Sequence, residues 1–337
     1  MSTEDIDDVV IEFVRGARLA AESGFDGVEL HASHGYLLAQ FISPKTNKRS
    51  DEYSLKDALH LLRRIVSSIR AVVPPTFAIV VKLNAADYTD NASGVDDENG
   101  YTRATPSGEE TRALAHVTEI ASWGMIDFIE ISGGDDENPK FMEAKSSTPS
   151  TRQALFSKFS KRAMSVLPTH AETNPTNLSS STRPPPLILL TGSLTTYEQF
   201  RICLESNHAH LLGIGRLSIL CPELPRLLHS TSNLDSFLVD IPSPSFESRF
   251  LDRAWRRLDR ILGMPRLIGA GLGMAWYVVM MRHMVEDQDG GDLGDVDAAV
   301  KMWLWTAPSA KRSIRWVWTR TLISLIVVCF AVAFVVF

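Results

Sequence analysis

Two histidines and a tyrosine lie close together near the N-terminus. His31, His34 and Tyr36 come directly after the apolar residues 27–30, which have the composition of a buried strand. Core packing has no use for three hydrogen-bonding side chains at such a point. Two imidazoles can hold a carbonyl or anionic oxygen, and a phenol two residues later can donate a proton. The spacing therefore predicts a substrate site that contains these three side chains.

A second group of polar residues follows closely, with Ser43-Pro44 leading into Asn47 and Arg49. Together with the two histidines and Tyr36, this stretch closely resembles the signature of the old yellow enzyme family of FMN-dependent ene-reductases. The resemblance implies that His31 and His34 bind the carbonyl of an activated, enone-like alkene. It implies that Tyr36 donates a proton to the alkene carbon. The expected partner is thus a small-molecule substrate.

The same resemblance implies FMN as the cofactor, with NADPH or NADH as the reductant. Lys82, within Val-Lys-Leu-Asn, matches the cation beside the N1 and O2 edge of the flavin. Two later turns match the loops that hold the FMN phosphate. These turns contain Gly192 with Ser193, and Gly215 with Arg216. The chain is therefore expected to be an FMN-dependent NAD(P)H oxidoreductase.

Simpler interpretations of the same residues remain open. A lysine such as Lys82 also occurs as one half of an ion pair or with its stem along apolar surface. A histidine such as His31 also occurs as a structural residue. A zinc site at Glu29, His31 and His34 is not expected, because the strand and turn spacing lacks a third fixed ligand. No metal is predicted.

Short apolar runs alternate with helical patterns along residues 6–214, which favours a parallel sheet. The sequence predicts strands at 27–30, 77–83, 127–131, 187–190 and 210–214, and helices at 6–23, 55–73, 109–123, 153–167 and 197–207. The last two strands are about 24 residues apart, which is typical of a (β/α) barrel. The predicted fold class is therefore α/β, of the (β/α)8 TIM-barrel type, with about five of the eight β/α units present.

Three strands of the family's barrel have no counterpart in this sequence, so the chain is expected to be N-terminally truncated relative to the family. A five-stranded parallel fragment leaves two sheet edges with unpaired backbone groups. The chain is expected to pair with another copy as a homo-oligomer that completes the barrel, to fold differently, or to be part of a longer protein. The alternative function is a catalytically inactive half-barrel that serves as a membrane-anchored interaction protein.

The C-terminal end is apolar. Residues 321–337 contain no charged side chain, and Trp316, Trp318 and several basic residues precede them. This pattern predicts a single-pass transmembrane anchor over 316–337, with the bulk of the chain cytosolic. The preceding domains are predicted as a partial flavin-oxidoreductase barrel over 1–235 and a helical extension over 236–310. Within that extension, the basic residues 246–262 suit either a membrane surface or the barrel, and 267–281 suits a buried or interfacial helix.

The composition excludes some other classes of function. The net charge of -6 argues against nucleic acid as a partner. The three cysteines, Cys203, Cys221 and Cys329, show neither pairing nor metal-ligand spacing, which favours a reducing compartment. The acidic N-terminus lacks the apolar core of a secretory signal.

Overall fold

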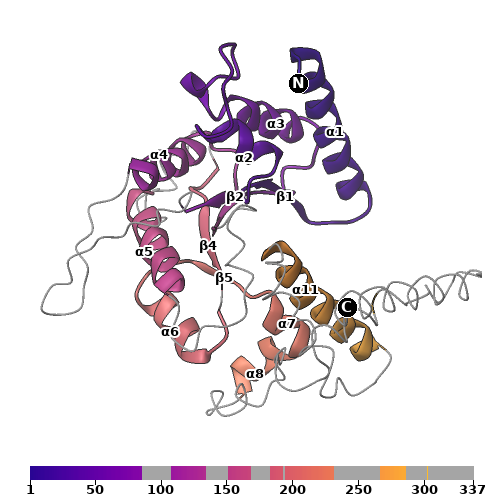
Figure 1. The fold of residues 1–337 in the computed structure, drawn as a ribbon, viewed down its shortest axis with the longest axis vertical. Helices are drawn as coiled ribbons and strands as arrows, with labels where there is room; N and C mark the ends of the chain where they lie inside the picture. Colours follow the sequence, from indigo (N-terminus) through magenta and orange to yellow (C-terminus); the bar gives the residue numbers. More distant parts are fainter. Residues whose placement is uncertain are drawn as a thin grey trace, which may run out of the picture. The chain divides into compact units, whose positions relative to one another are not determined.

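The computed structural model describes residues 1–85, 108–133, 151–167, 183–192, 194–230, 266–285 and 302. The chain divides into two compact units, and the boundary along the chain lies between Ile214 and Gly215. The first unit contains all five strands, and the second contains the later helices (Figure 1). The predicted basic helix at 246–262 and the predicted anchor at 316–337 lie outside the described residues.

The first unit is built on a five-stranded parallel sheet with the strand order β1-β2-β3-β4-β5. The strands are β1 (Gly27–Ala32), β2 (Ala78–Asn84), β3 (Phe128–Ser132), β4 (Leu187–Thr191) and β5 (Leu211–Gly213). Each strand pairs with the next one along the chain, as the strands of a (β/α) barrel do. The α/β prediction with five strands in this order is confirmed.

Helices alternate with these strands and lie along one side of the sheet (Figure 1). They are α1 (Thr3–Glu22), α2 (Leu37–Ile42), the 3-10 turn η1 (Leu55–Asp57), α3 (His60–Arg70), α4 (Gly108–Ser122), α5 (Thr151–Val166) and α6 (Tyr197–Glu205). The prediction of a single helix over 55–73 is wrong, because the structure has two separate helical elements there. Leu59 leaves the helical conformation with ψ near 3°, and its side chain is buried, so η1 and α3 are separate elements.

Local sequence explains where α1 begins and which face it buries. The Ser2 hydroxyl accepts from the backbone N–H of Asp5, and the Asp5 carboxylate accepts from the backbone N–H of Ser2. This capping box satisfies two backbone donors that the helix would otherwise leave unpaired. Ile6, Val10 and Ala17 are buried at helical spacing along one stripe of α1.

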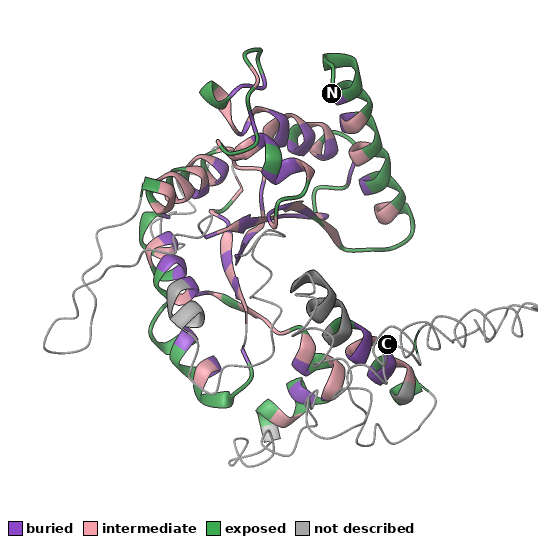
Figure 2. Ribbon diagram, in the orientation of Figure 1, coloured by how far each residue is buried: buried purple, intermediate pink, exposed green. Residues whose placement is uncertain are grey.

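The two faces of the sheet differ in chemistry. Because strand side chains alternate between faces, Ile79, Val81 and Ile129 lie on the face that the helices cover, and all three are fully buried. Figure 2 shows the strands of the sheet mostly in the colours of buried and intermediate residues. The opposite face carries polar side chains from neighbouring strands, among them Lys82 and Glu130. The apolar face supplies the core, and the polar face is where a ligand could be bound.

The second unit contains α7 (Arg216–Leu220), α8 (Leu224–Ser230) and α11 (Arg266–Val285). Trp276, Val279 and Met280 of α11 are buried together, and Ile219 and Leu220 of α7 pack against them. The prediction of a helix at 267–281 is confirmed by α11. Among the described residues, no helix has the length and apolar character needed to cross a membrane.

Candidate functional site

The turn after β1 brings His34 back over the end of the sheet. His34 and Gly35 both have a positive φ, of 60° and 77°, which is uncommon for a residue with a side chain. The His34 backbone N–H donates to Asn84 Oδ1 at 3.3 Å, and its ring Nε2 lies 3.0 Å from Ser132 Oγ. Contacts with β2 and β3 therefore hold a strained turn in place, as is common at functional sites.

His31 and Tyr36 complete a cluster of three rings with His34. The ring centroid of His31 lies 4.9 Å from that of His34 and 5.1 Å from that of Tyr36. The Ser33 hydroxyl lies 3.1 Å from His31 Nδ1, which fixes one ring nitrogen and leaves Nε2 for a ligand. Tyr36 is 52% exposed at the start of α2. The structure thus brings together all three residues that the motif predicted.

Burial disfavours the charged form of both histidines. It lowers the pKa of His34 to about 4, and the positive charge of Lys82 adds to the effect, as does that of His31 when its ring is protonated. Burial lowers the pKa of His31 as well, followed by the charge of Lys82. A neutral imidazole can donate one N–H bond to a carbonyl oxygen without carrying a charge of its own.

Lys82 lies in the middle of the polar face and forms a buried ion pair. The register places His31 beside Lys82, and Lys82 beside Glu130. Lys82 Nζ donates to Glu130 Oε1 at 2.6 Å, and Glu130 is only 8% exposed. The sequence left open whether Lys82 is paired, and the structure shows that it is. Its ammonium still lies on the same face of the sheet as the His31 side chain.

Glu29 adds a second carboxyl group to this face, two residues before His31. Partial burial raises the pKa of Glu29 to about 7, and a hydrogen bond with Glu130 and repulsion from its carboxylate add to the increase. Lys82 opposes this shift through its positive charge. The polar face therefore holds one fixed cation between carboxyl groups, one of which titrates near neutral pH.

The second half of the motif has a structural role. The buried Asn47 side chain donates to the carbonyl oxygens of Phe41 and Tyr53, at 2.7 and 2.9 Å. Arg49 pairs with Asp51 and also donates to the backbone of Met1. These contacts fix the segment between α2 and η1 that follows the ring cluster.

The first predicted phosphate loop lies at the end of β4. Gly192 has φ 118°, which residues with a side chain rarely adopt. A Cβ atom at Gly192 would lie 3.2 Å from the Phe156 ring, and one at Gly133 would lie 2.2 Å from it. Two glycines are thus needed where the ends of β3 and β4 meet α5. Ser193 lies outside the described residues.

The second predicted phosphate loop begins the second unit. Gly215 precedes α7, and Arg216 is its first residue. The Arg216 guanidinium carbon lies 6.0 Å from the centre of the Tyr277 ring on α11. Arg216 and Tyr277 belong to the second unit, and Lys82 belongs to the first.

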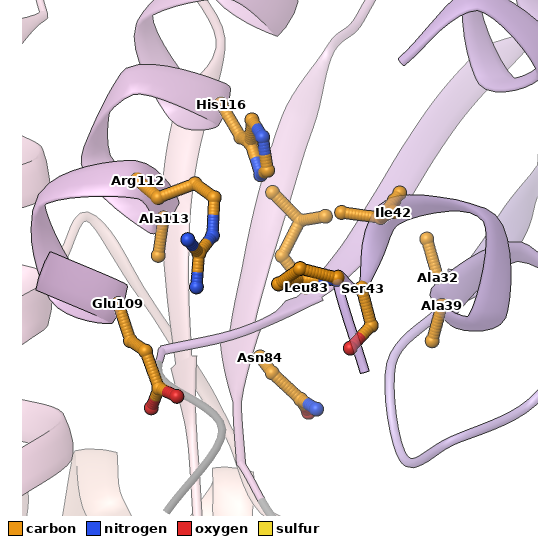
Figure 3. Close-up of a pocket in the computed structure, with 11 residues that line it drawn as sticks. Ala32, Ala39, Ile42, Ser43, Leu83, Asn84, Glu109, Arg112, Ala113 and His116 are labelled. Carbon is orange, nitrogen blue, oxygen red and sulfur yellow. The ribbon is translucent and has the colours of Figure 1, made fainter. Parts of the chain in front are cut away.

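A small cavity lies beside the carboxyl end of β2, between α2 and α4 (Figure 3). It encloses about 60 Å³, and Glu109, Arg112 and His116 of α4 line one wall opposite Ile42 and Ser43. Burial lowers the pKa of His116, and the charge of Arg112 adds to this. The cavity is large enough for a few water molecules. It does not contain the three motif rings.

Sequence reasoning missed the residues that support the three rings. Ser33, Asn84 and Ser132 lie at or just after the carboxyl ends of β1, β2 and β3, and Glu130 lies in the middle of β3. A polar residue in the last positions of an otherwise apolar strand was the available signal, because barrel enzymes place their chemistry there. Their pairing with His34 and Lys82 required the register of the sheet.

Sequence comparison finds a family model and several known proteins that part of the chain resembles. Residues 1–130 match the NADH:flavin oxidoreductase / NADH oxidase family. The chain is 32% identical over 236 residues to the NADH-dependent flavin oxidoreductase iliE of Neonectria sp. (strain DH2), covering 67% of this chain and 26% of that protein. It is 40% identical over 106 residues to the NADPH dehydrogenase of Bacillus subtilis (strain 168), covering 31% of this chain and 30% of that protein. The chain thus spans about a third or less of these two relatives.

The fold has counterparts among solved structures. Histamine dehydrogenase from Rhizobium sp. 4-9 superimposes with a TM-score of 0.50 at 19% identity, covering 72% of this chain and 29% of that one. At this identity the similarity supports the arrangement of strands and helices and not a shared substrate.

Proposed function

We propose that this chain, whose residues 1–130 match the NADH:flavin oxidoreductase / NADH oxidase family, is an FMN-dependent member of that family that reduces activated alkenes with NADPH or NADH. The observation that carries this proposal is the convergence of His31, His34 and Tyr36 at the end of β1. Relatives named as NADH-dependent and NADPH-dependent enzymes support the redox chemistry.

The residues present fit an FMN group. The polar face of the sheet offers the Lys82 ammonium, and the turn after β4 offers backbone that only a glycine readily adopts at residue 192. Lys82 would hold the ring edge, and the backbone at Gly192 would hold the phosphate. Arg216, the other phosphate ligand that the sequence predicts, belongs to the second unit. The bound and reduced cofactor would supply a hydride to the β-carbon of the alkene.

The chain's own side chains would perform the remaining tasks. The neutral rings of His31 and His34 would hold the substrate carbonyl with N–H donors and draw electron density from the β-carbon. The Tyr36 hydroxyl would donate a proton to the α-carbon as the β-carbon accepts the hydride. The exposure of Tyr36 suits a group that must meet a substrate arriving from solvent.

The test is steady-state reduction of 2-cyclohexenone by the full chain loaded with FMN. Tyr36→Phe is expected to lower kcat by about a hundredfold, the usual effect of losing a general acid, with a smaller change in KM. Tyr197→Phe is the matched control, because Tyr197 is also exposed but begins α6, away from the ring cluster. Equal rates for the Tyr36 variant and wild type would exclude Tyr36 as the proton donor.

The open edge of β1 bears on the assembly. Among the described strands, β1 pairs only with β2, so one row of its backbone groups has no strand beside it. We propose that a second copy of the chain covers this edge. A monomeric mass measured by light scattering would exclude this assembly.

The inactive half-barrel is the alternative function if the chain binds no flavin. The membrane anchor at 316–337 remains a prediction, testable by membrane fractionation with and without these residues.

A further inference from the structure

We infer that the cavity between α2 and α4 binds ordered water, and that this water connects Glu109 of α4 to Asn84 at the end of β2. Asn84 holds the turn at His34, because its Oδ1 atom accepts from the His34 backbone N–H. Glu109 is thereby assigned the role of a positioning residue for that turn. Neither flavin nor substrate enters this role, so it stands apart from the proposed function.

The Glu109 side chain has a buried oxygen that needs a hydrogen-bond donor. Its Oε2 atom is shielded from solvent, and it has no hydrogen-bond partner among the residues that the structure describes. Burying a carboxylate oxygen in this way costs free energy, so buried polar atoms in folded proteins almost always have a partner. A small donor therefore suits the space beside Oε2.

The cavity offers the room and the polar groups that ordered water requires. It encloses about 60 Å³, and a single water molecule needs about 10 to 15 Å³. Figure 3 shows the Glu109 and Arg112 side chains extending from α4 toward the space that Asn84 borders, and His116 lines the same wall. Cavities stay dry when only apolar groups line them, and these side chains make this one polar.

The charges around the cavity favour a neutral ligand. The Glu109 carboxylate and the Arg112 guanidinium have opposite charges and lie about one turn apart on α4. Burial lowers the pKa of His116, and the charge of Arg112 adds to this, so the charged form of the ring is disfavoured. An ion of either sign is repelled by one of the two charged groups. Water can donate to the carboxylate and accept from the guanidinium.

The same water can reach Asn84, because Glu109 and Asn84 line one small space. An asparagine amide has four hydrogen-bonding sites in total, so Asn84 can bind water and the His34 N–H together. His34 has a φ of 60°, which is uncommon for a residue with a side chain. Water that fixes the Asn84 amide therefore stabilises the turn that places the His34 ring.

The experiment is a crystal structure of the full chain, combined with amide hydrogen exchange measured by NMR. In wild type, ordered water is expected about 2.7 to 3.2 Å from Glu109 Oε2, with a further hydrogen bond to Arg112, His116 or Asn84. Glu109→Leu removes both carboxylate oxygens and is expected to exclude this water. Its His34 amide is then expected to exchange about fivefold faster, which corresponds to a weakening of about 1 kcal/mol.

Two matched variants and one reference amide separate hydration from folding. Glu109→Gln keeps an acceptor oxygen in nearly the same shape, and it is expected to keep both the water and the slow exchange. Thr118→Leu places a leucine at an exposed position of the same helix, outside the cavity, and is expected to leave the His34 exchange unchanged. The amide of Ile120, which is buried on α4, reports any change in overall stability.

The other outcomes overturn the inference. A wild-type crystal structure without ordered water beside Glu109 Oε2, or with an ion in its place, excludes the site, even if Glu109→Leu does not fold. If Glu109→Leu speeds the exchange of His34 and Ile120 equally, Glu109 has only a structural role. Because no flavin is used in either measurement, these results leave the proposed function to its own test.

Discussion

The Nε2 atom of His34 lies 3.0 Å from the Oγ atom of Ser132, although 98 residues separate the two along the chain. Ser132 ends β3, and His34 follows β1, so the contact spans two strand pairings. This hydrogen bond ties a turn with an uncommon backbone conformation to the sheet. The ring cluster therefore depends on a residue that the N-terminal motif does not contain.

Ser132→Ala removes the partner of His34 and is expected to lower the free energy of unfolding by about 1 kcal/mol. Urea denaturation measures this loss. The matched control is Ser122→Ala, because the Ser122 hydroxyl forms a hydrogen bond with its own exposed helix end and does not contact the site. Equal losses for the two variants would show that the contact between Ser132 and His34 has no special importance.

The low pKa of His34 predicts a stability that declines in acid. Its pKa is about 4 in the folded chain, against about 6.5 for an unperturbed histidine. Between these two values the unfolded chain binds more protons than the folded one, so the free energy of unfolding falls as the pH drops. The expected loss from pH 6.5 to 5 is about 1 kcal/mol, reduced by partial exposure.

His34→Gln removes the titrating group. Between pH 6.5 and 5 its free energy of unfolding is therefore expected to fall by about 1 kcal/mol less than that of wild type. Urea unfolding at pH 5 and 6.5 measures both curves. An identical pH dependence in wild type and His34→Gln would contradict the burial of a neutral ring at this position.

Glu29 predicts the opposite trend. Its pKa is raised to about 7, so the folded chain retains a proton that the unfolded chain has already lost above about pH 4.3. The contribution of Glu29 to the stability of wild type therefore becomes less favourable as the pH rises from about 4.3 to 7. Glu29→Gln, which stays neutral, is expected to be more stable than wild type at pH 8 and equal at pH 4. The gain is less than about 1 kcal/mol, because the Glu29 side chain keeps contact with solvent.

Glu52→Gln provides the control for this comparison, since Glu52 is an exposed glutamate outside the sheet. A lower stability of Glu29→Gln at pH 8, measured by the same denaturation, would mean that the Glu29 carboxylate is stabilised by its surroundings.

The fold could be predicted largely from sequence, because strand positions follow from local patterns. Continuous apolar runs located each strand to within two residues. The contact between Lys82 and Glu130 could not be predicted, because it joins strands 48 residues apart and depends on their register. The break before His60 was missed for a similar reason. Helical periodicity continues through Leu59, so the sequence gives no sign that the helix is interrupted there. In the structure Leu59 has a non-helical backbone and a buried side chain, and this depends on tertiary packing.

Lys82→Met leaves the Glu130 carboxylate buried without its partner. The expected cost is about 3 kcal/mol of unfolding free energy, the usual result of breaking a buried ion pair from one side. The double variant Lys82→Met/Glu130→Gln removes both charges and is expected to recover most of that loss. Guanidinium denaturation of the two single variants and the double variant gives the coupling. Additive losses in the double variant would contradict a direct interaction.

The most direct test of the central claim is a flavin absorbance titration of the full chain with FMN, followed by addition of NADPH under anaerobic conditions. The account predicts a one-to-one complex whose oxidised flavin band is bleached by NADPH, and whose spectrum is perturbed by Lys82→Met. A chain that stays folded and colourless at saturating FMN would contradict it. In that case the three rings at the end of β1 belong to a half-barrel without redox function.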